Sequence, residues 1–208
     1  MNISKFLLID AVLVIAAIPL IFFVSGGKRK SPFLRSSSKE ELLRKASGKL
    51  PVKEKLRELE KFAKEQGSGI EFDSIIGIWK FISIRKKDTD EEDPVFSSLL
   101  RVFSAKIEFK KDLLTKNSTE LSVIASIQFG LFSIGFSGTG YLKGKQPLLP
   151  FCLNLIELKS GSNILMRRSL KAQEDKEKSF FAMIALEEND ELLSARAQGG
   201  EVVIWLKD

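Results

Sequence analysis

The residues able to perform chemistry are restricted in type. Among its 208 residues the sequence has no histidine and a single cysteine, Cys152. The lack of histidine excludes Ser-His-Asp and Cys-His pairs, and one cysteine excludes an internal disulfide, a CxxC redox pair and a cysteine-rich zinc site. A carboxylate-based enzyme, a binding protein or a scaffold remains open. We expect neither a metal ion nor a cofactor.

Two charged clusters have residue types suited to binding. The acidic run 88–93 offers carboxylates to a divalent cation, but it lacks the D-x-D-x-D-G spacing of a calcium loop and is interpreted as a solvated hairpin loop. Arg167 and Arg168 suit a phosphate or a carboxylate. Adjacent residues of a strand face opposite sides, so the alternative is one barrel-facing and one solvent-facing arginine.

The elements that position these residues are mostly strands. From residue 70 onward apolar residues recur with period 2 between turn residues, and no ten-residue helical pattern interrupts them. Such a chain favours an antiparallel up-and-down meander that closes into a barrel, which removes its edges. The nine predicted strands are 75–84, 99–109, 120–129, 131–143, 151–157, 163–170, 179–186, 192–197 and 201–206.

A barrel of about eight to ten strands is either filled by its own side chains or holds one small ligand. Glycine and serine alternate with phenylalanine between residues 129 and 140. This small volume leaves room for a ligand, or else the glycines are bends where the barrel curves. The candidate ligand-binding residues of such a cavity are Trp79, Phe81, Phe129, Phe136, Gly138, Gly140 and Arg167.

The N-terminal segment is typical of a membrane anchor. Residues 6–24 are apolar apart from Asp10, and 19 residues make a helix of about 28 Å. The basic residues that follow predict a single-pass protein with its bulk on the cytoplasmic or stromal side. A cleaved signal peptide is the alternative. The net charge of +6 arises from residues 25–65 and not from the strands, so no nucleic-acid partner is expected.

Between anchor and strands the sequence predicts a linker and two helices. Ser38 and Glu41 have capping-box spacing, and a second helix begins at Pro51. Its predicted apolar face is Val52, Leu56, Leu59, Phe62 and Ala63. We expect it to pack on the strands as a lid, or alternatively to lie on a membrane. The expected domains are 1–30, an anchor with a basic flank; 31–69, linker and amphipathic helices; and 70–208, a β-barrel.

Two segments resemble a known family. The opening strand Gly77-Ile78-Trp79-Lys80-Phe81 and the glycine-rich turn 199–200 before the last strand are similar to those of the plastid lipid-associated proteins, or fibrillins, in a divergent, cyanobacterial-like form. The resemblance covers about residues 39–208. It implies a mainly β fold, a lipocalin-like antiparallel up-and-down barrel with an N-terminal helical lead-in, and association with thylakoids or lipid globules. The sequence of residues 6–24 adds one transmembrane helix to this expected fold.

The resemblance also implies a function. We expect membrane-tethered binding or carrying of an apolar small molecule (a lipid, carotenoid or prenylquinone) in the barrel, without enzymatic activity. The alternative is a non-enzymatic assembly or interaction factor for a photosynthetic membrane complex, with a protein partner. A chromophore lyase using carboxylates and Arg167 or Arg168 is a third hypothesis.

Overall fold

The computed structural model describes residues 50–111, 120–170, 179–187 and 191–208. Residues Lys53–Asp208 form one compact unit. The predicted anchor at 6–24, the linker at 31–38 and the first predicted helix lie outside the described residues. Within the described ranges, no helix has both the length and the apolar character needed to cross a membrane.

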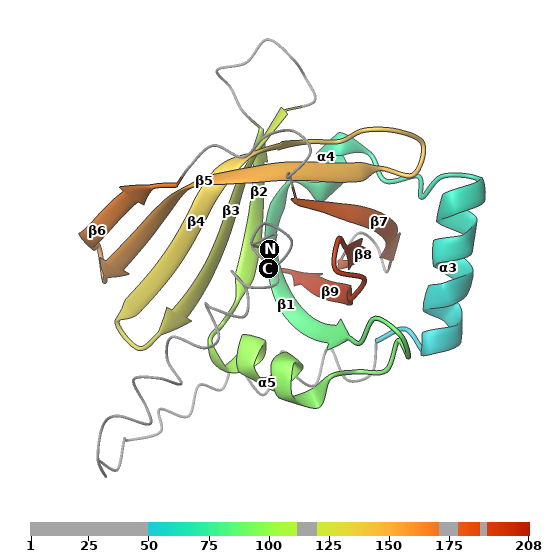
Figure 1. Ribbon diagram of the computed structural model, residues 1–208, viewed down its shortest axis with the longest axis horizontal. Coiled ribbons are helices and arrows are strands. Elements are labelled where there is room, and N and C mark those ends of the chain that lie inside the picture. The colour runs from blue at the N-terminus through green and yellow to red at the C-terminus, as the bar shows by residue number, and fades with distance from the viewer. Residues whose placement is uncertain (1–49, 112–119, 171–178, 188–190) are drawn as a thin grey trace, which may run out of the picture. The chain divides into compact units, whose positions relative to one another are not determined.

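Nine antiparallel strands form one sheet (Figure 1). Hydrogen-bonded pairs run from β1 through β2, β3, β4, β5, β7, β8 and β9 and back to β1, so eight strands close a ring, and β6 is added beside β5. The predicted mainly β, antiparallel class is confirmed. The strands are β1 Gly77–Arg85, β2 Lys106–Lys111, β3 Glu120–Phe129, β4 Phe132–Tyr141, β5 Leu148–Ser160, β6 Asn163–Ser169, β7 Ser179–Glu187, β8 Leu192–Ala197 and β9 Val202–Lys207.

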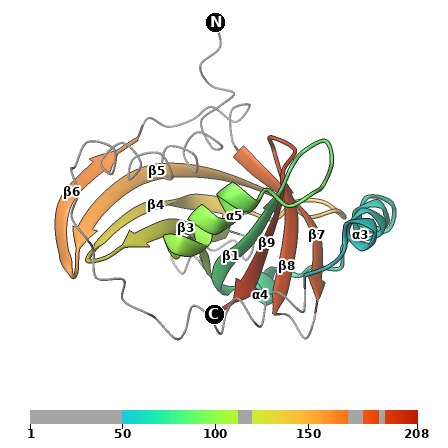
Figure 2. The same cartoon turned by 90° about the horizontal axis from the view of Figure 1, so that it is seen from below.

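Helix α3, Lys53–Glu65, confirms the second predicted helix and packs against β7 (Figure 2). Its predicted apolar face is wrong in part, because Glu60 is buried while Phe62 is 57% exposed. Two residues apart on a helix face nearly opposite sides. Turning Glu60 inward, where it meets Arg196, therefore turns Phe62 outward.

Two further helices were not predicted: α4, Phe72–Ile75, and α5, Pro94–Val102. The predicted strand 99–109 is therefore wrong over its first part, since β2 begins at Lys106. The cause is an N-cap: the Asp93 carboxylate accepts hydrogen bonds from the backbone N–H groups of Val95 and Phe96, both at 3.1 Å, and Pro94 starts the helix. The acidic run is likewise not a fully solvated loop, because Asp90 is 5% exposed.

Helix α5 packs along the part of β1 that does not pair with β2. The β1–β2 pairing ends at Lys80, and farther along β1 the Ile84 N–H donates to the Ser97 hydroxyl of α5 at 3.0 Å. Strand β5 divides in a similar way: residues 148–151 pair with β7, and residues 155–160 pair with β6. The far parts of β3, β4 and β5 (residues 126–129, 132–136 and 155–160) and all of β6 thus continue beyond the ring, and we call them the extension.

Aromatic side chains from four strands pack against one another inside the ring. Trp79 and Trp205 are fully buried, and Trp205 lies in ring contact with Phe81 (5.3 Å between centroids) and Phe181 (5.2 Å). Phe181 in turn stacks on Phe151 at 5.2 Å. These aromatic side chains come from β1, β5, β7 and β9, so they join opposite sides of the ring. Their packing favours a solid interior over a ligand cavity between them.

One buried hydroxyl group has an expected energetic cost. Ser83 is fully buried and its hydroxyl has no hydrogen-bond partner in the structure. Replacing Ser83 by alanine is expected to raise the free energy of unfolding by about 1 kcal/mol, because the unsatisfied hydroxyl is removed. Urea denaturation measures this change.

Ser97 is the matched control. It is also fully buried, but its hydroxyl contacts the N–H (3.0 Å) and the carbonyl (3.4 Å) of Ile84. Ser97→Ala is expected to lower the free energy of unfolding by about 1 kcal/mol. Equal effects of the two substitutions would contradict the distinction between the paired and the unpaired hydroxyl.

Candidate ligand-binding face

The inner surface of the extension is a continuous set of apolar side chains. Residues paired across antiparallel strands point to the same face, so the register assigns rows of neighbours. The rows across β3, β4, β5 and, where it reaches, β6 are Phe129, Phe132 and Ser160; Ile127, Ile134, Leu158 and Met166; and Ala125, Phe136, Ile156 and Arg168. Figure 1 shows these four strands side by side, leading away from the ring.

Exposure rises along this surface from the ring toward β6. Ile134 and Phe136 on β4 are 6% and 8% exposed, whereas Met166 on β6 is 45% exposed and Phe132 at the hairpin end is 42% exposed. Phe129 is half-buried and stacks on Phe132 with 5.7 Å between ring centroids. The partly exposed members of the set, which we call the apolar face, are Phe129, Phe132, Ile156, Leu158 and Met166.

A positively charged side chain lies beside the apolar face. Arg168 shares a row with Phe136 and Ile156, is exposed, and makes no hydrogen bond or ion pair with any described residue. Arg167 points the other way and donates to the Glu157 carboxylate from Nε (2.6 Å) and Nη2 (2.5 Å). The two arginines face opposite surfaces of the sheet, as neighbouring strand residues do, but both are exposed on β6 outside the ring, so the expectation that one of them faces the barrel interior is not confirmed.

The predicted cavity residues are spread over the ring and the extension, although the register places Trp79 and Phe136 in one row through Ile107 and Ala125. Trp79 and Phe81 lie in the ring, where Trp79 Nε1 donates to the Ile75 carbonyl at 2.7 Å. Phe129 and Phe136 lie on the inner surface of the extension, two rows apart. Arg167 lies on the opposite surface. Sequence reasoning missed Ile156, Leu158 and Met166, although the alternation of residues 156–158 and 166–168 was a usable signal. Arg168 was considered there only as an anion-binding residue, and Phe132 was not among the candidate ligand-binding residues.

Gly138 and Gly140 permit close approach of two strands. A Cβ atom on Gly138 would lie 1.8 Å from the carbonyl oxygen of Cys152, and one on Gly140 would lie 3.0 Å from that of Pro150. A β-bulge between Ser137 and Gly138 accompanies this approach. Backbone proximity, and not ligand space, accounts for glycine at these two positions.

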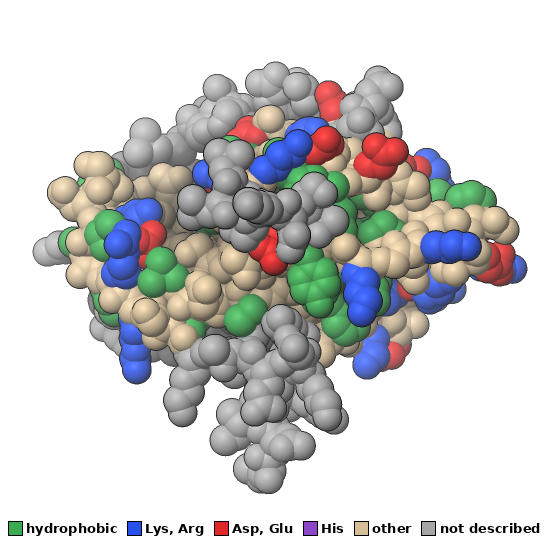
Figure 3. Space-filling view, turned by 90° about the horizontal axis from the view of Figure 1, so that it is seen from above, with side chains coloured by type: hydrophobic (Ala, Val, Ile, Leu, Met, Phe, Trp, Pro, Cys, Tyr) green, Lys and Arg blue, Asp and Glu red, His purple; other side chains and the backbone are tan. Residues whose placement is uncertain are grey.

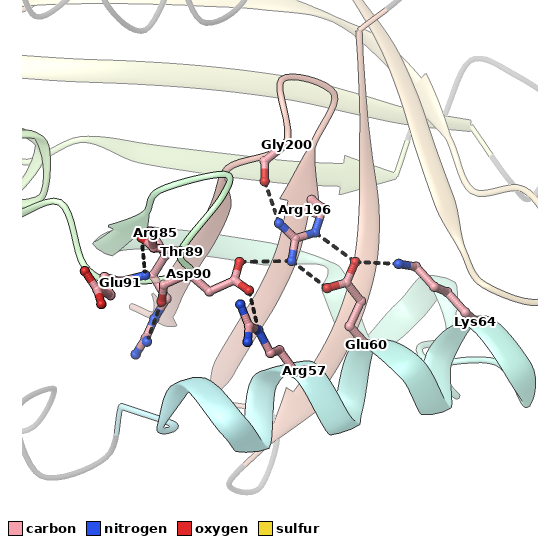
Figure 4. Close-up of polar contacts among 9 residues, drawn as sticks. All are labelled: Arg57, Glu60, Lys64, Arg85, Thr89, Asp90, Glu91, Arg196 and Gly200. Carbon is pink, nitrogen blue, oxygen red and sulfur yellow. Dashed lines mark hydrogen bonds and ion pairs between the residues drawn. The ribbon is translucent and has the colours of Figure 1, made fainter.

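A second cluster of charged side chains lies where α3 meets the ends of β8 and β9 (Figure 4). Arg196 on β8 binds the Glu60 carboxylate with two nitrogens, Nε at 2.8 Å and Nη2 at 2.6 Å, and Nη2 also reaches Asp90 at 3.2 Å. Arg57 of α3 also donates to the Asp90 carboxylate, from Nε to Oδ2 at 2.8 Å. The cluster therefore fastens both the helix and the acidic loop to the ring.

The electrostatics of this cluster indicate a structural role. Hydrogen bonding from Arg196 lowers the pKa of Glu60, outweighing the opposing effect of burial. Burial acts to raise the pKa of Asp90, but the hydrogen bonds from Arg57 and Arg196 make the net shift a lowering. Both carboxylates are thus held charged and paired, which suits an ionic fastening better than proton transfer. In the described part of the chain, no three metal-ligating side chains gather into a candidate metal site.

Comparison with known proteins gives no neighbour: no family model, no curated protein and no solved structure matches this sequence. The resemblance to plastid lipid-associated proteins therefore stays a prediction.

Proposed function

We propose that this protein is a non-enzymatic, membrane-tethered binder of an apolar small molecule, such as a lipid, carotenoid or prenylquinone. The ligand lies on the apolar face of the extension and not between the aromatic side chains of the ring. In this proposal the ring is a lipocalin-like barrel with a filled interior, and residues 6–24 hold it at the bilayer that supplies the ligand. A tether of this kind raises the effective concentration of ligand at the site.

The observation that supports the proposal is the graded exposure of one apolar surface. Its inner end belongs to the core, while Phe132 and Met166 remain 42% and 45% exposed. Covering about 300 Å² of apolar surface at about 25 cal/mol per Å² gives roughly 7 kcal/mol before the costs of association. Arg168 at the edge favours a ligand with an acidic or strongly polar head group.

A dye titration tests this assignment. The full chain is titrated with N-phenyl-1-naphthylamine, a neutral apolar dye whose emission rises on leaving water. The double variant Leu158→Ser/Met166→Ser is expected to bind the dye about tenfold more weakly, because two apolar contacts are lost. Each comparison is made within the same full chain, so dye bound by residues 6–24 contributes equally.

The control variant is Ile164→Ser. Ile164 lies on the same strand as Met166 and is 47% exposed, but it pairs with Lys159 on the opposite surface of the sheet. Its replacement is expected to leave the dye affinity within about twofold of the original. An equal loss in the control and in the double variant would show that the dye does not report the apolar face.

A second candidate function, that of an interaction factor, is favoured by β6. This strand lies at the edge of the sheet and all seven of its residues are exposed. An exposed edge is able to pair with an extended segment of another protein. A photoreactive benzophenone side chain in place of Leu165 tests this: a single protein crosslinked in the native membrane supports the function, and its absence contradicts it.

A further inference from the structure

The exposed apolar side chains of the protein are concentrated at one end. Among the described residues, ten large hydrophobic side chains are exposed, and five of these ten lie on two neighbouring hairpin tips. They are Leu131 (78%), Leu165 (55%), Ile164 (47%), Met166 (45%) and Phe132 (42%). Monomeric proteins rarely expose such contiguous apolar groups without a function for them.

The two tips lie side by side at one end of the sheet, with Phe132 and Met166 on its inner surface and Ile164 on the opposite one. The β3–β4 turn is bonded directly to the β5–β6 turn, since the Gly161 N–H donates to the Leu131 carbonyl at 2.8 Å. Phe132 pairs with Ser160 in the adjoining strands. Figures 1 and 2 show the two hairpin ends side by side in both views. The five side chains are therefore presented together on hydrogen-bonded strands.

The charges around the tips are positive. Residues 121–142, which contain the β3–β4 hairpin, have no charged side chain, and residues 155–170 contain Lys159, Arg167 and Arg168 against Glu157 alone. Glu157 is already paired with Lys159 at 3.0 Å and with Arg167 at 2.5 Å. In Figure 3 basic side chains lie next to hydrophobic ones at the end of the molecule where β6 lies, on the left.

We propose that these hairpin tips insert into the surface of a phospholipid bilayer that contains anionic lipids. Apolar side chains with basic residues close behind them fit the boundary between acyl chains and head groups. Each basic side chain near an anionic surface adds to the attraction. Phe62, in contrast, lies on α3 between Lys61 and Lys64, with Glu58 and Glu65 nearby.

The tips share Phe132 and Met166 with the apolar face, but their other three side chains lie outside the small-molecule site. Leu131 and Leu165 lie at a turn and at a β-bulge, and Ile164 faces the surface opposite the apolar face. The variant Leu131→Ser/Leu165→Ser is therefore expected to lose insertion and to keep the dye affinity of the parent chain. Leu158→Ser, in contrast, is expected to weaken dye binding and to keep insertion.

Quenching by brominated lipids tests the insertion in the full chain. Cys152 is replaced by serine, Leu131→Cys is labelled with the environment-sensitive fluorophore NBD, and the protein is added to vesicles whose acyl chains carry bromine. The label at position 131 is expected to lose most of its emission in vesicles of phosphatidylcholine with phosphatidylglycerol. The control is Val95→Cys, which is 65% exposed on α5 and is expected to keep its emission.

The outcomes separate the proposals. Weaker quenching in vesicles of phosphatidylcholine alone, or at high salt, supports the contribution of anionic lipids. Full emission from position 131 in both kinds of vesicle overturns the insertion and leaves a protein as the occupant of the tips. Quenching at position 131 together with unchanged dye binding in Leu158→Ser/Met166→Ser would overturn the small-molecule site alone.

Discussion

Replacing Gly138 by alanine is expected to lower the free energy of unfolding by about 3 kcal/mol or more. The added methyl group would lie 1.8 Å from the Cys152 carbonyl oxygen and 2.8 Å from the Leu153 Cα atom. Both are backbone atoms, so relief requires that β4 and β5 move apart, which disturbs their hydrogen bonds. Urea denaturation of the full chain, followed by circular dichroism, measures the loss.

Gly135 provides the control on the same strand. A Cβ atom there meets nothing within 4 Å. Gly135→Ala is expected to be neutral or to stabilise by up to about 1 kcal/mol, because alanine restricts the unfolded chain. If Gly138→Ala unfolded at the same urea concentration as Gly135→Ala, the close approach of β4 and β5 would be wrong.

Replacing Arg196 by methionine is expected to cost about 3 kcal/mol of stability. Two carboxylates, Glu60 and Asp90, with side chains 10% and 8% exposed, would lose their shared partner. Among the described residues, Glu60 would keep only Lys64, and Asp90 only Arg57; both of these partners are more than half exposed, so the two buried carboxylates would be poorly compensated, which is costly. Arg57→Met is the control: that side chain is 52% exposed, and Asp90 keeps Arg196, so a loss below about 1 kcal/mol is expected.

The same cluster predicts a dependence on pH. Because the pKa values of Glu60 and Asp90 are lowered in the folded protein, the unfolded chain binds protons first as the pH falls. The stabilisation is therefore complete above the ordinary carboxyl pKa of about 4 and is lost as the pH falls through the lowered values. Arg196→Met is expected to flatten this dependence. Parallel stability curves for parent and variant at acidic pH would contradict it.

The strands were predictable because each has a period-2 pattern bounded by turn residues, as at β3 and β8. Helix α5 was missed because Leu99 to Phe103 suits a strand or a helix equally well, and the decisive signal was the N-cap Asp93 followed by Pro94. The extension was not predictable. It depends on β5 changing its partner from β7 to β6, which is a long-range choice that local patterning does not encode.

The candidate site was predictable only in chemical type. An apolar ligand surface with an arginine was expected, but its location depends on facts absent from the sequence. A β-bulge between Leu158 and Lys159 helps to decide that Arg168, and not Arg167, shares the inner surface of the extension. The partner of Glu60 is Arg196, which lies 136 residues away in the sequence. The only local signal for this ion pair was a glutamate on the inward face of a helix.

The most direct test of the ligand-binding face is to identify what the protein carries. The full chain and the Leu158→Ser/Met166→Ser variant are purified from the native membrane in detergent, extracted with organic solvent and analysed by mass spectrometry. We predict a stoichiometric lipid or isoprenoid in the parent extract that is strongly reduced in the variant, with Ile164→Ser retaining it. An empty parent extract from folded protein, or equal amounts of the molecule in all three proteins, would contradict the assignment.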